Sequence, residues 1–171
     1  TTGFEFDFTW LATENFILRG AAAYNDGRIK NFQPQCFTGQ TQEQGCTEQI
    51  NPGTGLPTLQ DRAGAPLGLA PKWNVNLGMT YETPVGNGMT GIMTLDGRYS
   101  SSYNVGSAPD QFQDDYVMID ASLRLLGVDD LWEVAVIGRN LTNKAIIVGG
   151  FERALTGGGT GTPAAAGLSQ R

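Results

Sequence analysis

The strictest constraint on this chain is an alternation of apolar and polar residues that persists over segments of about ten residues. Residues 3–12 show the pattern most clearly, with an aromatic side chain at every second position. The aromatic positions are Phe4, Phe6, Phe8 and Trp10, and Glu5, Asp7 and Thr9 stand between them. Because successive side chains of a β-strand point to opposite faces, this segment predicts a strand with one apolar and one polar face.

The same period returns in five further segments, so the expected fold class is all-β with antiparallel strands. The segments are 16–25, 73–82, 90–99, 117–125 and 132–138. A weaker segment at 161–171 brings the expected total to about seven strands.

Two pairings between neighbouring segments keep like faces together. In the first, Trp10 lies opposite Leu18, so that the apolar sides of both strands coincide. In the second, a tight turn at 127–130 sets Arg124 directly across from Glu133, where opposite charges support the register.

The connections between these segments alternate between short and long. Short turns are expected at 12–15, 83–88 and 127–130, and longer loops at 26–70, 100–115 and 143–162. Strands of about ten residues joined in this way are typical of an antiparallel transmembrane β-barrel. The short turns would face the periplasm, and the loops, above all the long loop 26–70, would lie outside the cell.

Aromatic residues at the strand ends fit a membrane with two interfaces. Trp10, Tyr81 and Trp132 lie beside the short turns, and Phe4, Tyr24, Trp73 and Tyr99 lie beside the longer loops. Aromatic girdles at both edges of an apolar band predict this arrangement. In the alternative, a soluble β-sandwich, the same rings would close the ends of a protein core.

Charged residues recur on the polar side of the strands, and we interpret them as an ion-pair lattice that lines a wet lumen. The lattice comprises Asp7, Arg19, Asp96, Arg98, Asp120, Arg124, Glu133 and Arg139. Its carboxylates, together with Glu5, could instead supply a catalytic pair, but structural networks perturb carboxylates as well.

Composition narrows the function further. The chain has no His, which removes the commonest general base and transition-metal ligand, so neither catalysis nor a metal or other cofactor is expected. The serines at 100–102 consequently lack a partner for nucleophilic catalysis. A net charge of -6 offers no surface for nucleic acid. No apolar run reaches the length of a membrane-spanning helix, and residues 1–10 do not resemble a signal peptide.

Cys36 and Cys46 enclose a polar segment that contains no third metal ligand of the His or Cys type. We expect them to form a disulfide, which implies an oxidising compartment, with two free thiols as the alternative. The enclosed segment is the best candidate for contact with an external ligand. Its polar side chains Gln40, Gln42 and Gln44 suit sugar binding or simple solubility.

Two local motifs receive plain interpretations. Asn140-Leu141-Thr142 matches the acceptor pattern for N-glycosylation, but a strand end explains it equally simply. The Gly-rich run at 156–162 lacks the Lys that a phosphate-binding loop requires, so it is expected to be a flexible loop.

Three longer stretches together resemble the last part of the barrel of a TonB-dependent outer-membrane receptor. They are residues 3–26, 70–88 and 132–143, and the most specific pieces are Ala70-Pro71-Lys72-Trp73 and Gly138-Arg139-Asn140-Leu141-Thr142-Asn143. The resemblance implies that residues 1–171 supply the C-terminal portion of a 22-stranded barrel. It departs from the family at the end, where Ala164 replaces an expected Arg and Arg171 replaces a terminal aromatic, so the closing strand is either truncated or atypical.

The resemblance also implies a function and partners. A receptor of this family, located in the Gram-negative outer membrane, takes up an external ligand such as a metal chelate, vitamin or glycan. The implied partners are outer-membrane lipid, the rest of the barrel, a plug domain that this chain lacks and would meet at the lattice, and the TonB complex, reached through an N-terminal part that is also missing. The alternatives are a small independent outer-membrane barrel and the secreted β-sandwich binding module.

Overall fold

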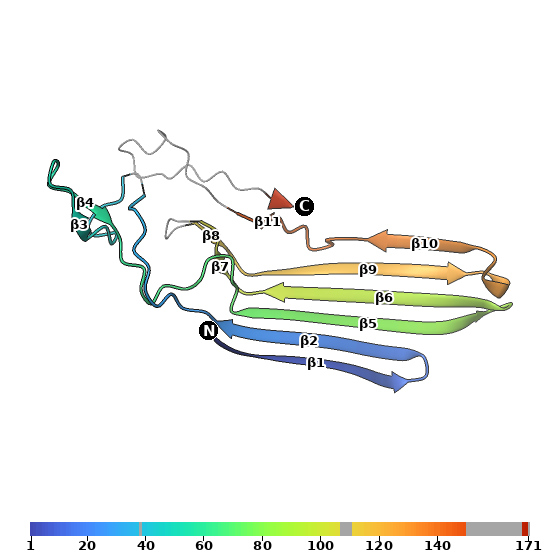
Figure 1. Cartoon of the computed structure of the whole chain (residues 1–171). Helices are drawn as coiled ribbons and strands as arrows, with labels where there is room; N and C mark the ends of the chain where they lie inside the picture. Colours follow the sequence, from blue (N-terminus) through green and yellow to red (C-terminus); the bar gives the residue numbers. More distant parts are fainter. Residues whose placement is uncertain (38, 107–110, 150–168, 171) are drawn as a thin grey trace.

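The computed structural model describes residues 1–37, 39–106, 111–149 and 169–170. Its main element is a six-stranded antiparallel sheet with the strand order β1-β2-β5-β6-β9-β10 (Figure 1). The strands are β1 (Thr2–Thr13), β2 (Phe16–Asp26), β5 (Trp73–Gly86), β6 (Met89–Ser100), β9 (Tyr116–Leu126) and β10 (Glu133–Gly138). Each strand pairs with the preceding one of this series, so the sheet is a meander. The short turns lie at one end of it and the long loops at the other.

The first predicted pairing is confirmed. Trp10 lies opposite Leu18, and Thr9 opposite Arg19, so the register keeps the apolar positions of β1 and β2 on one face. The register shifts only between Leu11 and Thr13, where the turn begins. The alternation alone determines this register, because a slip by one residue would turn every side chain to the other face.

The turn between β5 and β6 is shorter than the predicted 83–88. The two strands continue to Gly86 and Met89, which leaves Asn87 and Gly88 as the turn. Both residues have positive φ angles, 52° and 72°, as a two-residue hairpin of the Asn-Gly kind requires. Pro84, which the predicted turn included, stays within β5 next to a register shift.

The second predicted pairing is wrong by two residues. Arg124 lies opposite Ala135, and Glu133 lies opposite Leu126. The cause is the connection, where a short 3-10 turn, η1 (Val128–Asp130), precedes β10 and the Gly127 N–H donates to the Trp132 carbonyl. Arg124 and Glu133 still share a face and meet diagonally, with a distance of 2.8 Å between Arg124 Nη2 and Glu133 Oε2.

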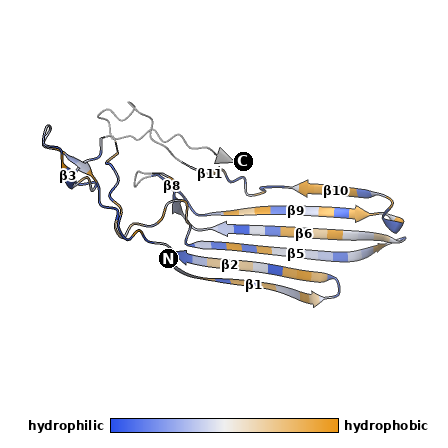
Figure 2. Cartoon of the chain, in the orientation of Figure 1, coloured by the Kyte–Doolittle hydropathy of each residue, from blue (hydrophilic) through white to orange (hydrophobic). Residues whose placement is uncertain are grey.

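The apolar face of the sheet has no second layer against it. Figure 2 shows the alternation of apolar and polar residues along the strands. Leu77 is 50% exposed, Val134 60% and Val136 70%, although all three belong to the apolar rows. Among the described residues the only buried apolar side chains are Cys46 and Val105, both outside the sheet. A sandwich with these rows facing inward is therefore the wrong architecture, and lipid is the environment that fits such a surface.

The loops contain more structure than the sequence indicated. The long loop includes the hairpin β3 (Glu48–Ile50) and β4 (Pro57–Leu59), and the next loop includes the pair β7 (Tyr103–Asn104) and β8 (Phe112–Gln113). Isolated bridges at Arg28–Pro66 and Gln35–Leu59 connect the outgoing and returning parts of the long loop. Residues 27–72 thus form a protruding arm and not the irregular segment that we expected.

Among the described residues the main sheet has six strands. The expected seventh segment, 161–171, and the Gly-rich run at 156–162 lie outside the described residues, apart from β12 (Ser169–Gln170), which pairs with β11 (Ile146–Ile147). The loop expected at 143–162 is described only to residue 149. In the part of the chain that the structure describes, no helix is long and apolar enough to cross a membrane.

Candidate functional site

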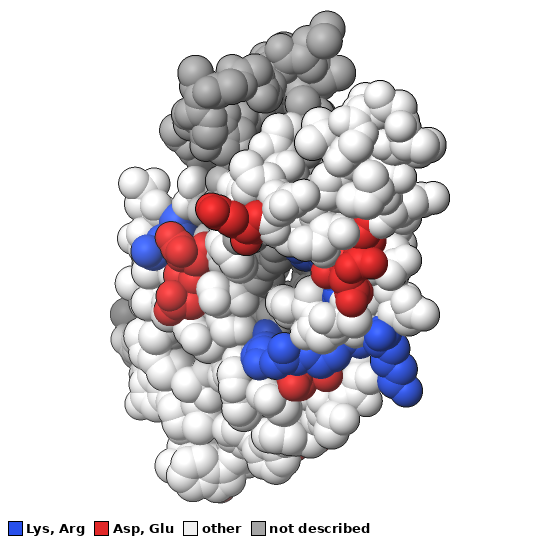
Figure 3. All heavy atoms as spheres, turned by 90° about the vertical axis from the view of Figure 1, so that its left-hand side faces the viewer, with Lys and Arg blue, Asp and Glu red and all other residues white. Residues whose placement is uncertain are grey.

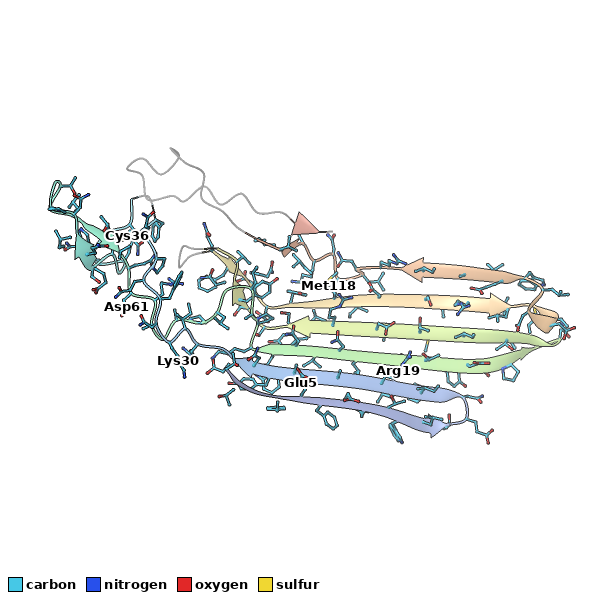
Figure 4. The ribbon with its side chains drawn as sticks, viewed as in Figure 1. Glu5, Arg19, Lys30, Cys36, Asp61 and Met118 are labelled. Atoms are coloured by element: carbon cyan, nitrogen blue, oxygen red, sulfur yellow. A yellow bond between two sulfur atoms is a disulfide. The ribbon has the colours of Figure 1, made fainter. Side chains whose placement is uncertain are left out.

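The polar face of the sheet forms a hollow that five strands line together. Side chains of its polar face include Asp7, Thr9, Arg19, Asn76, Asp96, Arg98, Met118 and Asp120. Glu5, Arg19 and Met118, labelled in Figure 4, mark this face on β1, β2 and β9. The registers of the paired strands therefore bring most of the predicted lattice residues together in this hollow.

Gly78 gives the centre of this hollow its shape. Arg19, Gly78, Asp96 and Asp120 occupy successive positions across β2, β5, β6 and β9. A Cβ at Gly78 would lie 2.6 Å from Asp96 Oδ1, so the Asp96 carboxylate extends over the backbone of β5. It thereby points toward Arg19 and away from Asp120, which relieves the repulsion of two carboxylates placed directly opposite each other.

Asp120 has its own partner at the end of β10. Its Oδ1 accepts a hydrogen bond from the Asn140 backbone N–H, and the Leu141 N–H donates to the Ile119 carbonyl. Asn140 has a φ of 49°, and its side chain bonds the backbone N–H and carbonyl of Lys144. The Asn140-Leu141-Thr142 motif therefore terminates a strand, as the plainer interpretation held, with the Asn140 amide used inside the turn.

Only part of the predicted lattice closes into ion pairs. Among the described residues, Arg124 and Glu133 are the one lattice pair within salt-bridge distance, and both nitrogen–oxygen contacts of the fork measure 2.8 Å. Arg19 donates to the Thr80 hydroxyl at 3.3 Å. The hollow thus presents charged groups such as Arg98 and Asp7 that form no salt bridge among the described residues.

Three of the predicted girdle residues lie side by side at the loop end of the sheet. Phe4, Tyr24 and Trp73 occupy successive positions on β1, β2 and β5, with ring centroids 5.8 Å apart for Phe4–Tyr24 and 4.9 Å for Tyr24–Trp73. Tyr99 lies two residues further into the sheet, opposite Val75. At the other end Trp10, Tyr81 and Trp132 are exposed. The Trp132 indole covers Gly127, where a Cβ would lie 2.3 Å from the ring.

The expected disulfide is present at the far end of the arm. Cys36 and Cys46 are bonded, and Cys46 is buried (Figure 4 labels Cys36). The side chain of Gln40 donates to the Gln44 carbonyl and to Gln60 Oε1 and accepts from the Phe37 N–H. Gln44 similarly accepts from the Thr41 N–H. Two of the three glutamines considered for sugar binding thus hold the loop, while Gln42 is exposed.

The sequence did not single out the base of the arm. Asp26 Oδ1 lies 3.2 Å from Arg28 Nε and 3.3 Å from Lys72 Nζ, so one carboxylate joins the two limbs where they leave the sheet. Figure 3, which views the loop end, shows Lys and Arg side chains gathered beside Asp and Glu there. The Ala70-Pro71-Lys72-Trp73 stretch was noticed as a motif, but its pairing partner could not be identified by spacing.

Several buried polar residues of the shorter loop were also missed. Ser100, Asn104, Gln111 and Gln113 are all buried. Tyr103 donates its hydroxyl to the Ile147 carbonyl, and burial raises the pKa of Tyr103, with Tyr116 adding to the shift. Amide and hydroxyl residues in a loop look the same in sequence whether they face water or each other, so no pattern could have found them.

The described residues contain no group of three or more His, Cys, Asp or Glu side chains placed to hold a metal ion. What the geometry offers is therefore a polar wall, a lipid-facing surface and an elaborate outer loop. The polar wall suits the lining of a passage, and the outer loop suits a recognition surface.

Comparison with a solved structure supports the fold. The siderophore receptor PiuA from Acinetobacter baumannii matches with a TM-score of 0.57 and 18% sequence identity, over 86% of this chain and 18% of the receptor. The chain thus spans 18% of the length of the protein that it matches, and at this identity the likeness concerns the fold alone. No curated protein matches the chain.

Comparison with family models establishes the family. The model described as "TonB dependent receptor-like, beta-barrel" matches residues 1–141, most of the chain. Barrels of this kind lie in the outer membrane of Gram-negative cells, and the family consists of transporters and not enzymes. The chain therefore belongs to the TonB-dependent receptor family, as part of its β-barrel.

Proposed function

We propose that this chain is the C-terminal portion of a receptor that takes up an external ligand with energy supplied by the TonB complex. The observation that supports this most is the family match over 1–141 on a sheet with one exposed apolar face and one polar hollow. The plug domain and the segment that contacts TonB would belong to other parts of the same protein.

In this proposal the two faces of the sheet have separate tasks. The apolar rows, with Leu77 midway between Trp73 and Tyr81 on β5, contact lipid, and the girdle aromatics lie at the two interfaces. The lattice side chains line the lumen, where they stiffen the wall and meet the plug. The absence of ion pairs for Arg98 and Asp7 among the described residues supports the second task, because unpaired charges on a wall suit a polar partner.

Among the ligand classes, a metal chelate of the siderophore type is the first to test, ahead of a vitamin or a glycan. Its support is the likeness to PiuA, which is a siderophore receptor. The arm that carries the Cys36–Cys46 disulfide is the proposed outer contact, because it protrudes furthest from the sheet in Figure 1.

The test uses the complete protein in its source cells under iron limitation. Uptake of radioactive iron supplied as ferric siderophores should depend on the receptor gene and should stop when a protonophore collapses the proton gradient. A receptor variant that lacks residues 37–57 should remain in the outer membrane but lose binding. Energised uptake of a glycan or vitamin with no iron uptake would replace the ligand class, and gene-dependent uptake that ignores the protonophore would contradict the TonB-energised mechanism.

A further inference from the structure

The outer loops of this chain are connected to one another by hydrogen bonds at two points. The first lies between the arm and the loop that carries β7 and β8, where the Leu69 N–H donates to the Asn104 carbonyl at 2.8 Å. The second lies between that loop and β11, where Gln113 Oε1 accepts from the Ile147 N–H at 2.6 Å and the Tyr103 hydroxyl donates to the Ile147 carbonyl at 3.4 Å. A continuous path therefore runs from the arm to the segment after β10.

The middle of this path is buried. Asn104 and Gln113 are each 7% exposed, and they belong to the paired strands β7 and β8. The Val105 N–H donates to the Gln111 carbonyl, which closes the same hairpin. Hydrogen bonds out of water are stronger than exposed ones and costly to leave unmade, so this hairpin is costly to open.

The arm side of the path is held in a strained conformation. Leu69 has a φ of 55°, in the left-handed region that side chains other than Gly, Asn or Asp rarely adopt. Such a conformation persists only where the surroundings impose it. In this conformation the Leu69 N–H donates to the Asn104 carbonyl.

We propose that the arm, the β7–β8 loop and the segment around β11 form one conformational unit, which the hydrogen bond between Gln113 and Ile147 holds together. Displacement of the arm would then change the conformation of the loops next to β9 and β10, which are far from the arm in the sequence. For a receptor this unit would report an occupied arm to the rest of the outer surface. That last use rests on the proposed function, while the unit itself does not.

Hydrogen exchange on the complete receptor in detergent tests the unit without any ligand. Gln113→Leu removes the acceptor for Ile147 at nearly equal size, and it should speed exchange of both the Ile147 and the Leu69 N–H by about tenfold. Gln113→Glu keeps the acceptor and should restore most of the protection at both sites. Gln42→Leu, an exposed position on the arm, is the matched control and should change neither.

The reverse experiment changes the arm, so it tests the proposal even if the Gln113 variant does not fold. Leu69→Pro removes the N–H and excludes the positive φ, so exchange at Ile147 should rise. Leu69→Gly keeps the bond and relieves the strain, so it should leave Ile147 protected. Coupling between two sites is reciprocal, so a rise at Ile147 in Gln113→Leu without a rise at Leu69, or no response of Ile147 to Leu69→Pro, overturns the proposal. Failed iron uptake with intact coupling would count against the proposed function alone.

Discussion

The sheet and the outer arm of this chain are stable for opposite reasons. The sheet has continuous ladders between long strands and leaves its large apolar side chains exposed. The arm has short strands, a disulfide and a buried centre at Cys46 and Gln60. A strand that faces lipid needs no protein core, because the bilayer accepts its apolar side chains and the neighbouring strands satisfy its backbone. A loop in water has to build its own small core or be cross-linked.

The largest expected effect comes from placing a charge on the lipid face. Leu77→Arg should destabilise the folded barrel by about 2–4 kcal/mol, the cost of a cation near the bilayer midplane. Thr94→Arg, on the lumen face opposite the uncharged Thr80 and Ser122, is the matched control and should be tolerated. Urea titration of the complete receptor folded into vesicles measures the difference. Equal losses on both faces would show that the assignment of the faces is wrong.

Removing the disulfide should weaken the arm and leave the sheet alone. Cys36→Ser with Cys46→Ser should lower the local stability of the arm by about 2–3 kcal/mol, because the unfolded loop regains its freedom. Limited proteolysis should then cut within 36–46 while the barrel stays intact. Simultaneous loss of the folded barrel would mean that the two regions are not independent.

A smaller effect is expected at the turn between β5 and β6. Gly88 has a φ of 72°, so Gly88→Ala should cost about 1–2 kcal/mol for a left-handed residue with a side chain. The Cβ itself has room, since its nearest neighbour would be Val128 Cγ2 at 3.4 Å. Gly53→Ala, in the arm, is the control because its φ is not in the positive range. Thermal unfolding of both variants should separate strain in the sheet from simple loss of Gly.

The smallest effect should come from the ion pair on the polar face. Both Arg124 and Glu133 are about two-fifths exposed, with side-chain exposures of 39% and 42%, so water and salt screen their attraction. Glu133→Gln should therefore reduce stability only slightly at low salt. It should have no effect in 1 M salt, where the Debye length is about a third of its value at 0.1 M. A large loss that persists in high salt would indicate that the pair is shielded by something that covers the lumen face.

The predictable parts of the fold are those that depend on local alternation. The period of two in residues 3–12 and 16–25 determined the faces, and the faces determined the register of β1 and β2. The positions of the tyrosine and tryptophan side chains at the strand ends followed from the same periods. The Asn87-Gly88 pair, which favours a two-residue turn, was also visible in the sequence, although the predicted turn at 83–88 was too long.

The predictions that were wrong concern contacts between distant segments. Whether Arg124 faces Ala135 or Glu133 is decided by the geometry of η1, which the alternation leaves free by steps of two residues. The arm pairs residues more than thirty positions apart, as in Arg28 with Pro66, and its polar composition conceals that pairing.

By itself, then, the sequence determined which residues share the apolar face of the sheet and which share the polar face, because side chains of a strand alternate regardless of what lies beside it. It also determined the family, through short motifs in order. Only the tertiary structure decided which charges meet, how Gly78 lets Asp96 turn from Asp120, and that the outer loops are joined through Gln113. Those outcomes depend on distances between segments far apart in the chain, which no local pattern encodes.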